Sequence, residues 1–262
     1  MINKLSEEAQ KIIENYLHLP ISGHEIVCPY YNNRRSNIRA GLRSLIGKGT
    51  PTDIAEEAAI IALREKQDFK KMDDKSLKEF LVNHKLGVDC SGFYYHVLDA
   101  ELHAQGLGNM REHLKFPYIK NPFRKLLTIF RPVEHAGVRT LSHEKNAIEI
   151  KLSEVAPGDM ITMISTGTNH NFNHLLLIHA VDGEKNKPKA IHYTHSFAWS
   201  SDGAYGHGIK QGEIKITDLN KNLLEQIWTE KEKTGADNET YRHAQLALEI
   251  KTKRLRALAK AS

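Results

Sequence analysis

The pattern of hydrophobic and polar positions changes near the middle of the chain. In the first part, apolar residues recur every three to four positions, which is typical of amphipathic helices. Later, short apolar runs separated by turn residues indicate strands. The predicted helices cover about 5–17, 51–67, 74–86 and 90–105, and the predicted strands cover 160–164, 174–181, 190–195 and 213–217. Helices followed by an antiparallel sheet predict the α+β class.

Local signals predict several helix ends. Thr50 is a predicted N-cap, and Pro51 suits the first turn because its missing N–H would be unpaired there anyway. Asp73 or Asp74 is expected to cap the next helix. Gly87 is expected to end that helix in the left-handed conformation.

The same pattern divides the chain into four parts. Residues 1–33 hold an N-terminal helix and a Pro-Tyr loop, residues 34–86 form a helical insertion, and residues 87–217 form the core. Within the core, 107–148 shows no clear period. Residues 218–262 are highly charged and predicted to be a helical C-terminal extension.

Composition excludes several classes of protein. With 262 residues and 40% hydrophobic residues, the chain can bury a core and is neither disordered nor fibrous. No apolar run approaches the roughly 18 residues of a membrane span, and the first residues lack the apolar stretch of a signal peptide, so we expect a soluble, cytoplasmic protein. A net charge of +5 permits an anionic polymer or nucleic acid as partner, although 37 basic and 32 acidic residues are mostly interspersed, which favours a solvated surface.

The chain has two cysteines, and one of them is a candidate nucleophile. Cys28 and Cys90 are too few for a disulfide framework or a four-thiolate zinc site, and no His-Glu-x-x-His motif occurs, so we expect neither a metal nor a cofactor. Cys90 follows the Gly87 turn at a helix start, where backbone N–H groups stabilise a thiolate. We therefore expect a lowered pKa and a nucleophilic thiol at Cys90. The alternative is a cysteine that only packs in the core.

Two histidine-bearing strands follow the cysteine and predict its partners. A cysteine nucleophile needs a base, and the base needs an orienting group. His174 begins an apolar strand, and the next strand carries His192 and His195. Their odd separation places these two side chains on opposite faces of the sheet, so only one can serve. We choose His192 because it lies inside the apolar start of its strand, which predicts a Cys90, His174 and His192 triad.

Three segments together resemble a known family. They are Asp89-Cys90-Ser91-Gly92-Phe93, the later Ala156-Pro157-Gly158-Asp159-Met160-Ile161, and His174 at the head of an apolar strand followed by Ile191-His192. As a set, they resemble the NlpC/P60 family of papain-like cysteine peptidases. The resemblance implies an α+β fold in which a helix bearing the nucleophile packs on an antiparallel sheet, and it implies cleavage of the peptide stems of bacterial cell wall.

The resemblance also implies roles for individual residues. Cys90 matches the nucleophile, His174 the base and His192 the orienting residue. Tyr30, directly after Pro29, matches a tyrosine that lines the site, and we expect it to add a donor for the oxyanion. The expected reaction is attack of the thiolate on an amide carbonyl, followed by hydrolysis of the thioester.

Alternatives remain open for the flanking residues and for the reaction. Asp89 and Ser91 either bind a substrate amine, or Asp89 caps the helix while Ser91 faces solvent. The preferred function is hydrolysis of a peptidoglycan-type or γ-linked peptide. The alternatives are an acyltransferase on the same fold and a catalytically idle module that binds an anionic partner.

Overall fold

The computed structural model describes residues 2–21, 23–33 and 42–259, and it has the predicted α+β character. The helices are α1 (Glu7–Leu17), α2 (Pro51–Arg64), α3 (Asp74–Asn83), α4 (Cys90–Ala104), α5 (Met110–His113), α6 (Pro122–Phe130), α7 (Pro132–His135), α8 (Val138–Leu141), α9 (Glu239–Leu246) and α10 (Arg256–Ala259). The strands are β1 (Ile2–Lys4), β2 (Ala147–Glu149), β3 (Met160–Thr166), β4 (Phe172–Glu184), β5 (Lys187–Phe197), β6 (Gly208–Lys215), β7 (Ile227–Glu230), β8 (Lys233–Thr234) and β9 (Glu249–Leu255).

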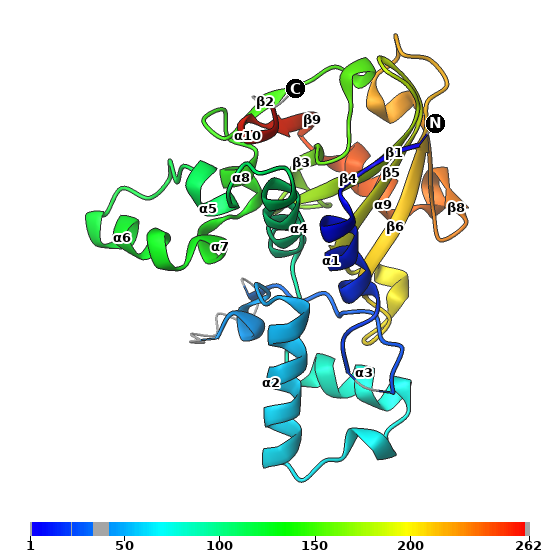
Figure 1. Cartoon of the computed structure of the whole chain (residues 1–262). Helices are drawn as coiled ribbons and strands as arrows, with labels where there is room; N and C mark the ends of the chain where they lie inside the picture. The colour runs from blue at the N-terminus through cyan, green and yellow to red at the C-terminus, as the bar shows by residue number, and fades with distance from the viewer. Residues whose placement is uncertain (1, 22, 34–41, 260–262) are drawn as a thin grey trace.

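One antiparallel sheet organises the molecule. Its strand order is β2-β9-β3-β4-β5-β6-β7-β8, and β1 pairs with the far end of β4. α1 and α4 lie together against one face, α9 lies against the other, and α2 and α3 form a lobe beyond the sheet (Figure 1). The four strands predicted from the sequence correspond to β3, β4, β5 and β6, with longer bounds than expected.

Side chains alternate between two cores along β4. Leu175 and Leu177 belong to the cluster formed with α1 and α4, whereas Leu176 and Ile178 belong to the cluster formed with β7 and α9. Both clusters are apolar, so the hydrophobic effect holds a layer on each face of the sheet. The parity of a residue along β4 therefore decides whether its side chain packs against α4 or against α9.

The local helix signals act as predicted, with one exception. Thr50 accepts from the N–H of Asp53 and the Asp53 carboxylate accepts from the N–H of Thr50, a complete capping box that confirms this start. Asp73 caps α3. The prediction that Gly87 ends this helix in the left-handed conformation is wrong, because Lys85 takes the positive φ of 61°. Gly87 instead lies so close to the carbonyl of Pro29 that a side chain would not fit.

The predicted insertion is helical where the structure describes it. η2 (Arg43–Ile46), α2 and α3 account for most of residues 42–86, while residues 34–41 lie outside the described residues. The stretch without a clear period, 107–148, contains four short helices, α5 to α8.

The prediction of a helical C-terminal extension is wrong. Residues 218–259 contribute three strands, and β9 lies inside the sheet between β2 and β3. Its charges are paired across the sheet: Arg254 makes two hydrogen bonds to the buried Asp159 carboxylate at 2.7 and 2.9 Å, and Lys251 pairs with Glu149 at 2.6 Å. Tertiary partners therefore make a strand of a charged sequence that was expected to form a solvated helix.

None of the described helices combines the length and the apolar character that a membrane crossing requires.

Candidate active site

Cys90 is the first residue of α4, as its sequence neighbours predict. Asp89 caps the helix by accepting from the N–H of Gly92 at 2.7 Å. The cysteine is 6% exposed, and the backbone N–H of Leu175 in β4 is close enough to its sulfur to lower the thiol pKa. The helix start thus presents the thiol to the sheet, directly beside the residue that follows His174.

A buried lysine holds the flanks of the cysteine. Lys48 Nζ lies 2.8 Å from the Asp89 carboxylate and donates to Ser91 Oγ at 2.6 Å, and Ser91 Oγ donates to Asp89 at 2.9 Å. Asp89 therefore caps the helix, as the second of the two interpretations proposed, but Ser91 is only 4% exposed and does not face solvent. Both side chains have a cationic partner in Lys48, and binding of a substrate amine by them stays a prediction.

The sheet opens next to Cys90. The hydrogen-bonded ladder between β4 and β5 begins at Leu177 and Thr194, so the preceding residues of β4 and the following residues of β5 are not paired with each other. Within the parted region, Ser196 Oγ donates to the carbonyl of Val88 at 2.6 Å and ties β5 to the segment before α4. At this opening, the segment before α4 therefore contacts β5 directly.

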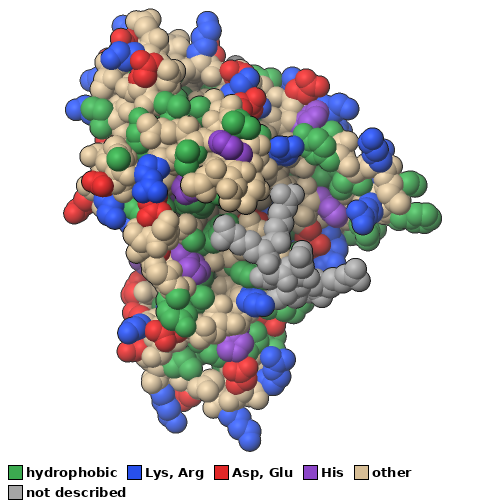
Figure 2. Space-filling view, turned by 180° about the vertical axis from the view of Figure 1, so that it is seen from behind, with side chains coloured by type: hydrophobic (Ala, Val, Ile, Leu, Met, Phe, Trp, Pro, Cys, Tyr) green, Lys and Arg blue, Asp and Glu red, His purple; other side chains and the backbone are tan. Residues whose placement is uncertain are grey.

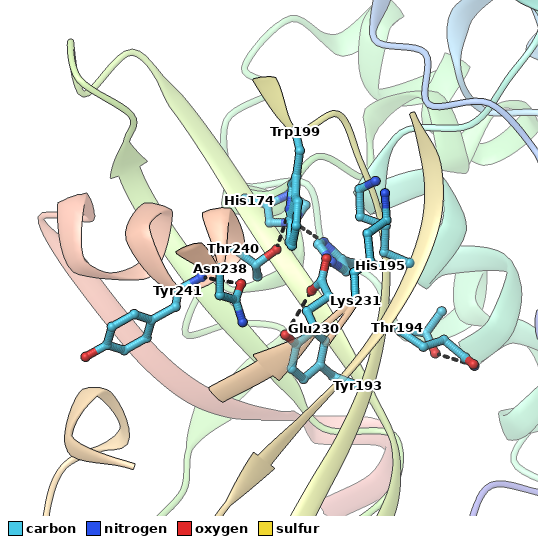
Figure 3. Close-up of polar contacts among 12 residues, drawn as sticks. His174, Tyr193, Thr194, His195, Trp199, Glu230, Lys231, Asn238, Thr240 and Tyr241 are labelled. Carbon is cyan, nitrogen blue, oxygen red and sulfur yellow. Dashed lines mark hydrogen bonds and ion pairs between the residues drawn. The ribbon is translucent and has the colours of Figure 1, made fainter. Parts of the chain in front are cut away.

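A chain of buried polar side chains begins at His174 (Figure 3). His174 Nε2 lies 2.7 Å from His195 Nδ1, and His195 Nε2 lies 3.0 Å from Glu230 Oε2. The hydroxyl of Tyr193 donates to the same carboxylate oxygen at 2.8 Å. All four residues are at most 2% exposed, so this relay is shielded from water.

The order of the bonds assigns the protons in the relay. A carboxylate only accepts, so His195 Nε2 carries the proton that Glu230 receives. With Nε2 as its only N–H, His195 accepts at Nδ1, and His174 Nε2 donates to it. This tautomer leaves Nδ1 of His174 as the nitrogen with a free lone pair, which is the atom that a general base requires.

His192 does not belong to this relay, which corrects the predicted orienting residue. The two histidines of β5 do lie on opposite faces, but it is His195 that shares the face of His174. His192 is half-buried near His179, with ring centroids 6.2 Å apart, and its Nδ1 lies 3.6 Å from Glu213. It sits four residues before Ser196, about 13 Å along an extended strand from the segment that contacts α4.

Cys90 and His174 approach the opening from different sides. Cys90 belongs to the core that contains Leu175, whereas strand alternation turns His174 towards the face of Leu176. No hydrogen bond joins Cys90 Sγ to His174 among the contacts of the described residues. The structure therefore places Cys90 Sγ near the backbone of Leu175 and the His174 ring on the opposite face of β4.

Burial keeps both groups neutral. Desolvation raises the pKa of the Cys90 thiol to about 12, with the charge of Asp89 as a second cause, so the expectation of a lowered pKa is wrong. Burial also lowers the pKa of His174 well below 6.5, with the neighbouring His195 and His243 contributing. At neutral pH the arrangement is a thiol beside a neutral imidazole, not a thiolate and imidazolium pair.

Tyr30 lies beside the segment that leads to Cys90, through a parallel bridge to Val88. Its ring packs edge-on against Phe197 at 6.1 Å, and Phe197 packs on the His174 ring at 4.4 Å. The Tyr30 hydroxyl accepts from Asn32 Nδ2 at 3.2 Å. The tyrosine is thus connected to the relay through one aromatic ring.

The second cysteine and the remaining histidines add no further centre. Cys28 is a free, buried thiol whose pKa burial raises to about 12. In the part of the chain that the structure describes, no three His, Cys, Asp or Glu side chains are grouped as metal ligands.

Sequence reasoning missed three residues that complete the surroundings. His195 carried a usable signal, since it was the alternative of opposite parity on the same strand. Glu230 and Lys48 carried none, because they lie 35 and 41 residues from the side chains that they contact. Only the folded sheet brings them to the site.

No model of a known protein family matches the chain, and neither a curated protein nor a solved structure matches it.

Proposed function

We propose that the chain is a cysteine hydrolase with an NlpC/P60-like, papain-like core, which cleaves an amide bond of a peptidoglycan-type or γ-linked peptide through a thioester on Cys90. One observation carries the proposal. A helix-start cysteine lies beside the strand residue that follows His174, and His174 is held by a fully buried His195 and Glu230 relay. A relay of this kind orients a base, which is the requirement for nucleophilic catalysis.

The protons and bonds balance in two steps. In the first step, Nδ1 of neutral His174 must come within hydrogen-bond reach of Cys90 Sγ. It then takes the thiol proton while Cys90 Sγ attacks the amide carbonyl, and the same proton passes to the leaving amine. In the second step, water attacks the thioester with His174 as base, and the acid product and the free thiol are released. The Cys90 backbone N–H at the start of α4 is a donor for the oxyanion, and the Tyr30 hydroxyl is the proposed second donor.

Because both groups are neutral, the proposed mechanism requires the thiol proton to move to His174 as Cys90 Sγ attacks. The lowered pKa of His174 keeps its imidazole unprotonated at neutral pH and able to accept a proton. The chain of bonds to His195 and Glu230 fixes the orientation of its ring. His195 and Glu230 are positioning residues in this mechanism, because they act on the substrate only through His174.

The decisive experiment combines product analysis with trapping of the intermediate. Wild type, Cys90→Ala and the buried-thiol control Cys28→Ala are incubated with peptidoglycan peptides and a broad amide library. We expect products and an acyl mass on Cys90 with wild type and Cys28→Ala, and neither with Cys90→Ala. Acyl transfer to an added amine in place of water would identify the acyltransferase alternative. Hydrolysis by Cys90→Ala would contradict the proposal.

The second candidate is a catalytically idle module of the same fold. It is favoured by the raised pKa of Cys90 and by the missing hydrogen bond between Cys90 and His174. This candidate predicts no product and no acyl adduct with any of the three proteins. Two variants compare the histidines of β5: His195→Ala is expected to lower turnover, whereas His192→Ala is expected to leave it unchanged.

A further inference from the structure

The segment between the buried residues Leu114 and Val133 forms an arm whose apolar side chains face solvent. α6 forms its outer part and projects from the body of the molecule (Figure 1). Its base is fixed, because the backbone of Lys115 exchanges two hydrogen bonds of 2.7 Å with the side chain of Asn146. α7 and α8 then pack the chain back onto α4. The arm is thus anchored at its base while α6 lies outside the core.

The apolar stripe of α6 faces solvent, whereas an ordinary surface helix turns its stripe towards the core. At 3.6 residues per turn, four side chains fall within about 100° of one another. These four are exposed by 50 to 79%: Phe123, Leu126, Leu127 and Phe130. Thr128, on the opposite side of the helix, is buried. Surface helices normally bury the apolar stripe, so α6 is turned outward and presents a surface for something to cover.

The charge of the arm is of one sign. Residues 114–133 contain five basic residues and no acidic residue. The five are Lys115, Lys120, Arg124, Lys125 and Arg131. Figure 2, which shows the opposite side of the molecule, has the apolar side chains gathered at the projecting end with basic side chains beside them. An apolar stripe accompanied only by basic residues matches a surface that is apolar inside and negative at its border.

We propose that this arm docks on an anionic lipid bilayer, with α6 lying in the plane of the interface and its stripe among the acyl chains. A helix of nine residues is too short to cross a bilayer and suits an interfacial position. Lys and Arg next to the stripe meet the phosphate groups of the lipids. A second copy of the chain is a poor occupant, because two arms rich in basic residues would face each other and, in the described part of the chain, only Arg131 has a carboxylate beside it, that of Glu134.

The test measures co-sedimentation with vesicles of phosphatidylcholine alone and of phosphatidylcholine mixed with phosphatidylglycerol. We expect wild type to pellet with the mixed vesicles, weakly with the neutral ones, and less at high salt. Phe123→Ser/Phe130→Ser should weaken binding at least about tenfold, since two rings leave the acyl region. The matched control is Ile60→Ser/Leu63→Ser on α2, whose side chains are 61 and 81% exposed and are expected to make no contribution.

A second pair of variants tests the charge. Arg124→Gln/Lys125→Gln should weaken binding to the mixed vesicles by about 10- to 30-fold, because each basic residue near the surface contributes about 1 kcal/mol. Lys185→Gln/Lys187→Gln, at the exposed turn after β4 and the exposed first residue of β5, is the control of equal charge and should bind like wild type.

Three results would overturn the proposal. The first is failure of wild type to pellet with the mixed vesicles, and the second is an equal loss in the variants and their controls. The third is self-association of wild type in light scattering that the Phe variant abolishes, which would assign the stripe to a second copy. Circular dichroism of each variant confirms that the fold is kept, which the exposure of all substituted side chains favours.

Discussion

The buried lysine beside Cys90 offers the sharpest test of the packing around the helix start. Lys48→Met keeps the length and the apolar stem of the side chain but removes its charge. The Asp89 carboxylate, whose side chain is 12% exposed, then loses its cationic partner and keeps two neutral donors, the N–H of Gly92 and the hydroxyl of Ser91. The substitution therefore leaves a buried charge that is only partly compensated.

The cost follows from the burial of the pair. Removing one partner of a buried ion pair costs about 3 to 5 kcal/mol, and the two remaining hydrogen bonds of Asp89 place the expected loss at about 3 kcal/mol. For a chain of this size that corresponds to a fall in Tm of about 6 to 12 °C. Lys48→Met/Asp89→Asn is expected to be more stable than Lys48→Met, because the neutral amide still caps α4 and no longer needs a cation.

Thermal and urea unfolding of the three variants measure the effect. The matched control is Lys251→Met, since Lys251 and Glu149 are 2.6 Å apart, close to the 2.8 Å between Lys48 and Asp89, but have side chains 35 and 59% exposed. Solvent screens this pair, so Lys251→Met should leave Tm unchanged within error. Equal stability of Lys48→Met and wild type, or equal losses in Lys48→Met and Lys251→Met, would refute the assignment of burial as the source of the effect.

Three further predictions concern the buried titratable groups. Glu230→Ala leaves His195 Nε2 and the Tyr193 hydroxyl without their acceptor and should lower the free energy of unfolding by about 3 kcal/mol. Tyr193→Phe should lower it by only about 1 kcal/mol in urea unfolding. Equal losses would contradict the shared acceptor. Burial lowers the pKa of His179 from 6.5 to about 4, so the unfolded chain takes up the proton first as the pH falls. This residue should therefore lower the free energy of unfolding by about 2 kcal/mol between pH 8 and pH 5. His179→Gln should remove this dependence on pH, and an unchanged dependence would disprove the assignment to His179. Because burial raises the pKa of Cys28 and Cys90 to about 12, iodoacetamide at pH 7.5 should label both thiols of the folded protein about 1,000-fold more slowly than in urea, and fast labelling of either thiol in the folded protein would contradict the raised value.

Local signals in the sequence predicted much of the fold. The starts of α2 and α4 depend on side chains within three residues of the helix end; Thr50 caps α2 as expected, and Asp89 caps α4, one of its two proposed roles. The charged segment 249–255 gave no such signal, because its carboxylate partners lie about a hundred residues away in the chain. A periodicity of charges alone cannot distinguish a solvated helix from a strand whose charges are paired across a sheet.

The candidate site shows the same limit at the level of single residues. Strand parity correctly separated His192 from His195, but the choice between them required the register of β5 on β4, which contains an irregularity between Ile178 and Ala180. The helix start alone predicted a lowered pKa for the Cys90 thiol, but burial raises this pKa and is the larger effect. Register and burial are properties of the assembled sheet, and no short segment encodes them.

The position of β9 has a consequence for the time course of folding. Among the described strands, β2 pairs only with β9, and β9 follows β3 in the chain after all of β4 to β8. The chain between the end of β3 at Thr166 and the start of β9 at Glu249 must close into a loop before β9 can pair. Such non-local pairing is slow because the conformational entropy of the loop is lost before any contact is gained. The edge of β3 that β9 covers is therefore an open template during folding, and the rate at which β9 arrives decides how long the chain can pair with the wrong partner.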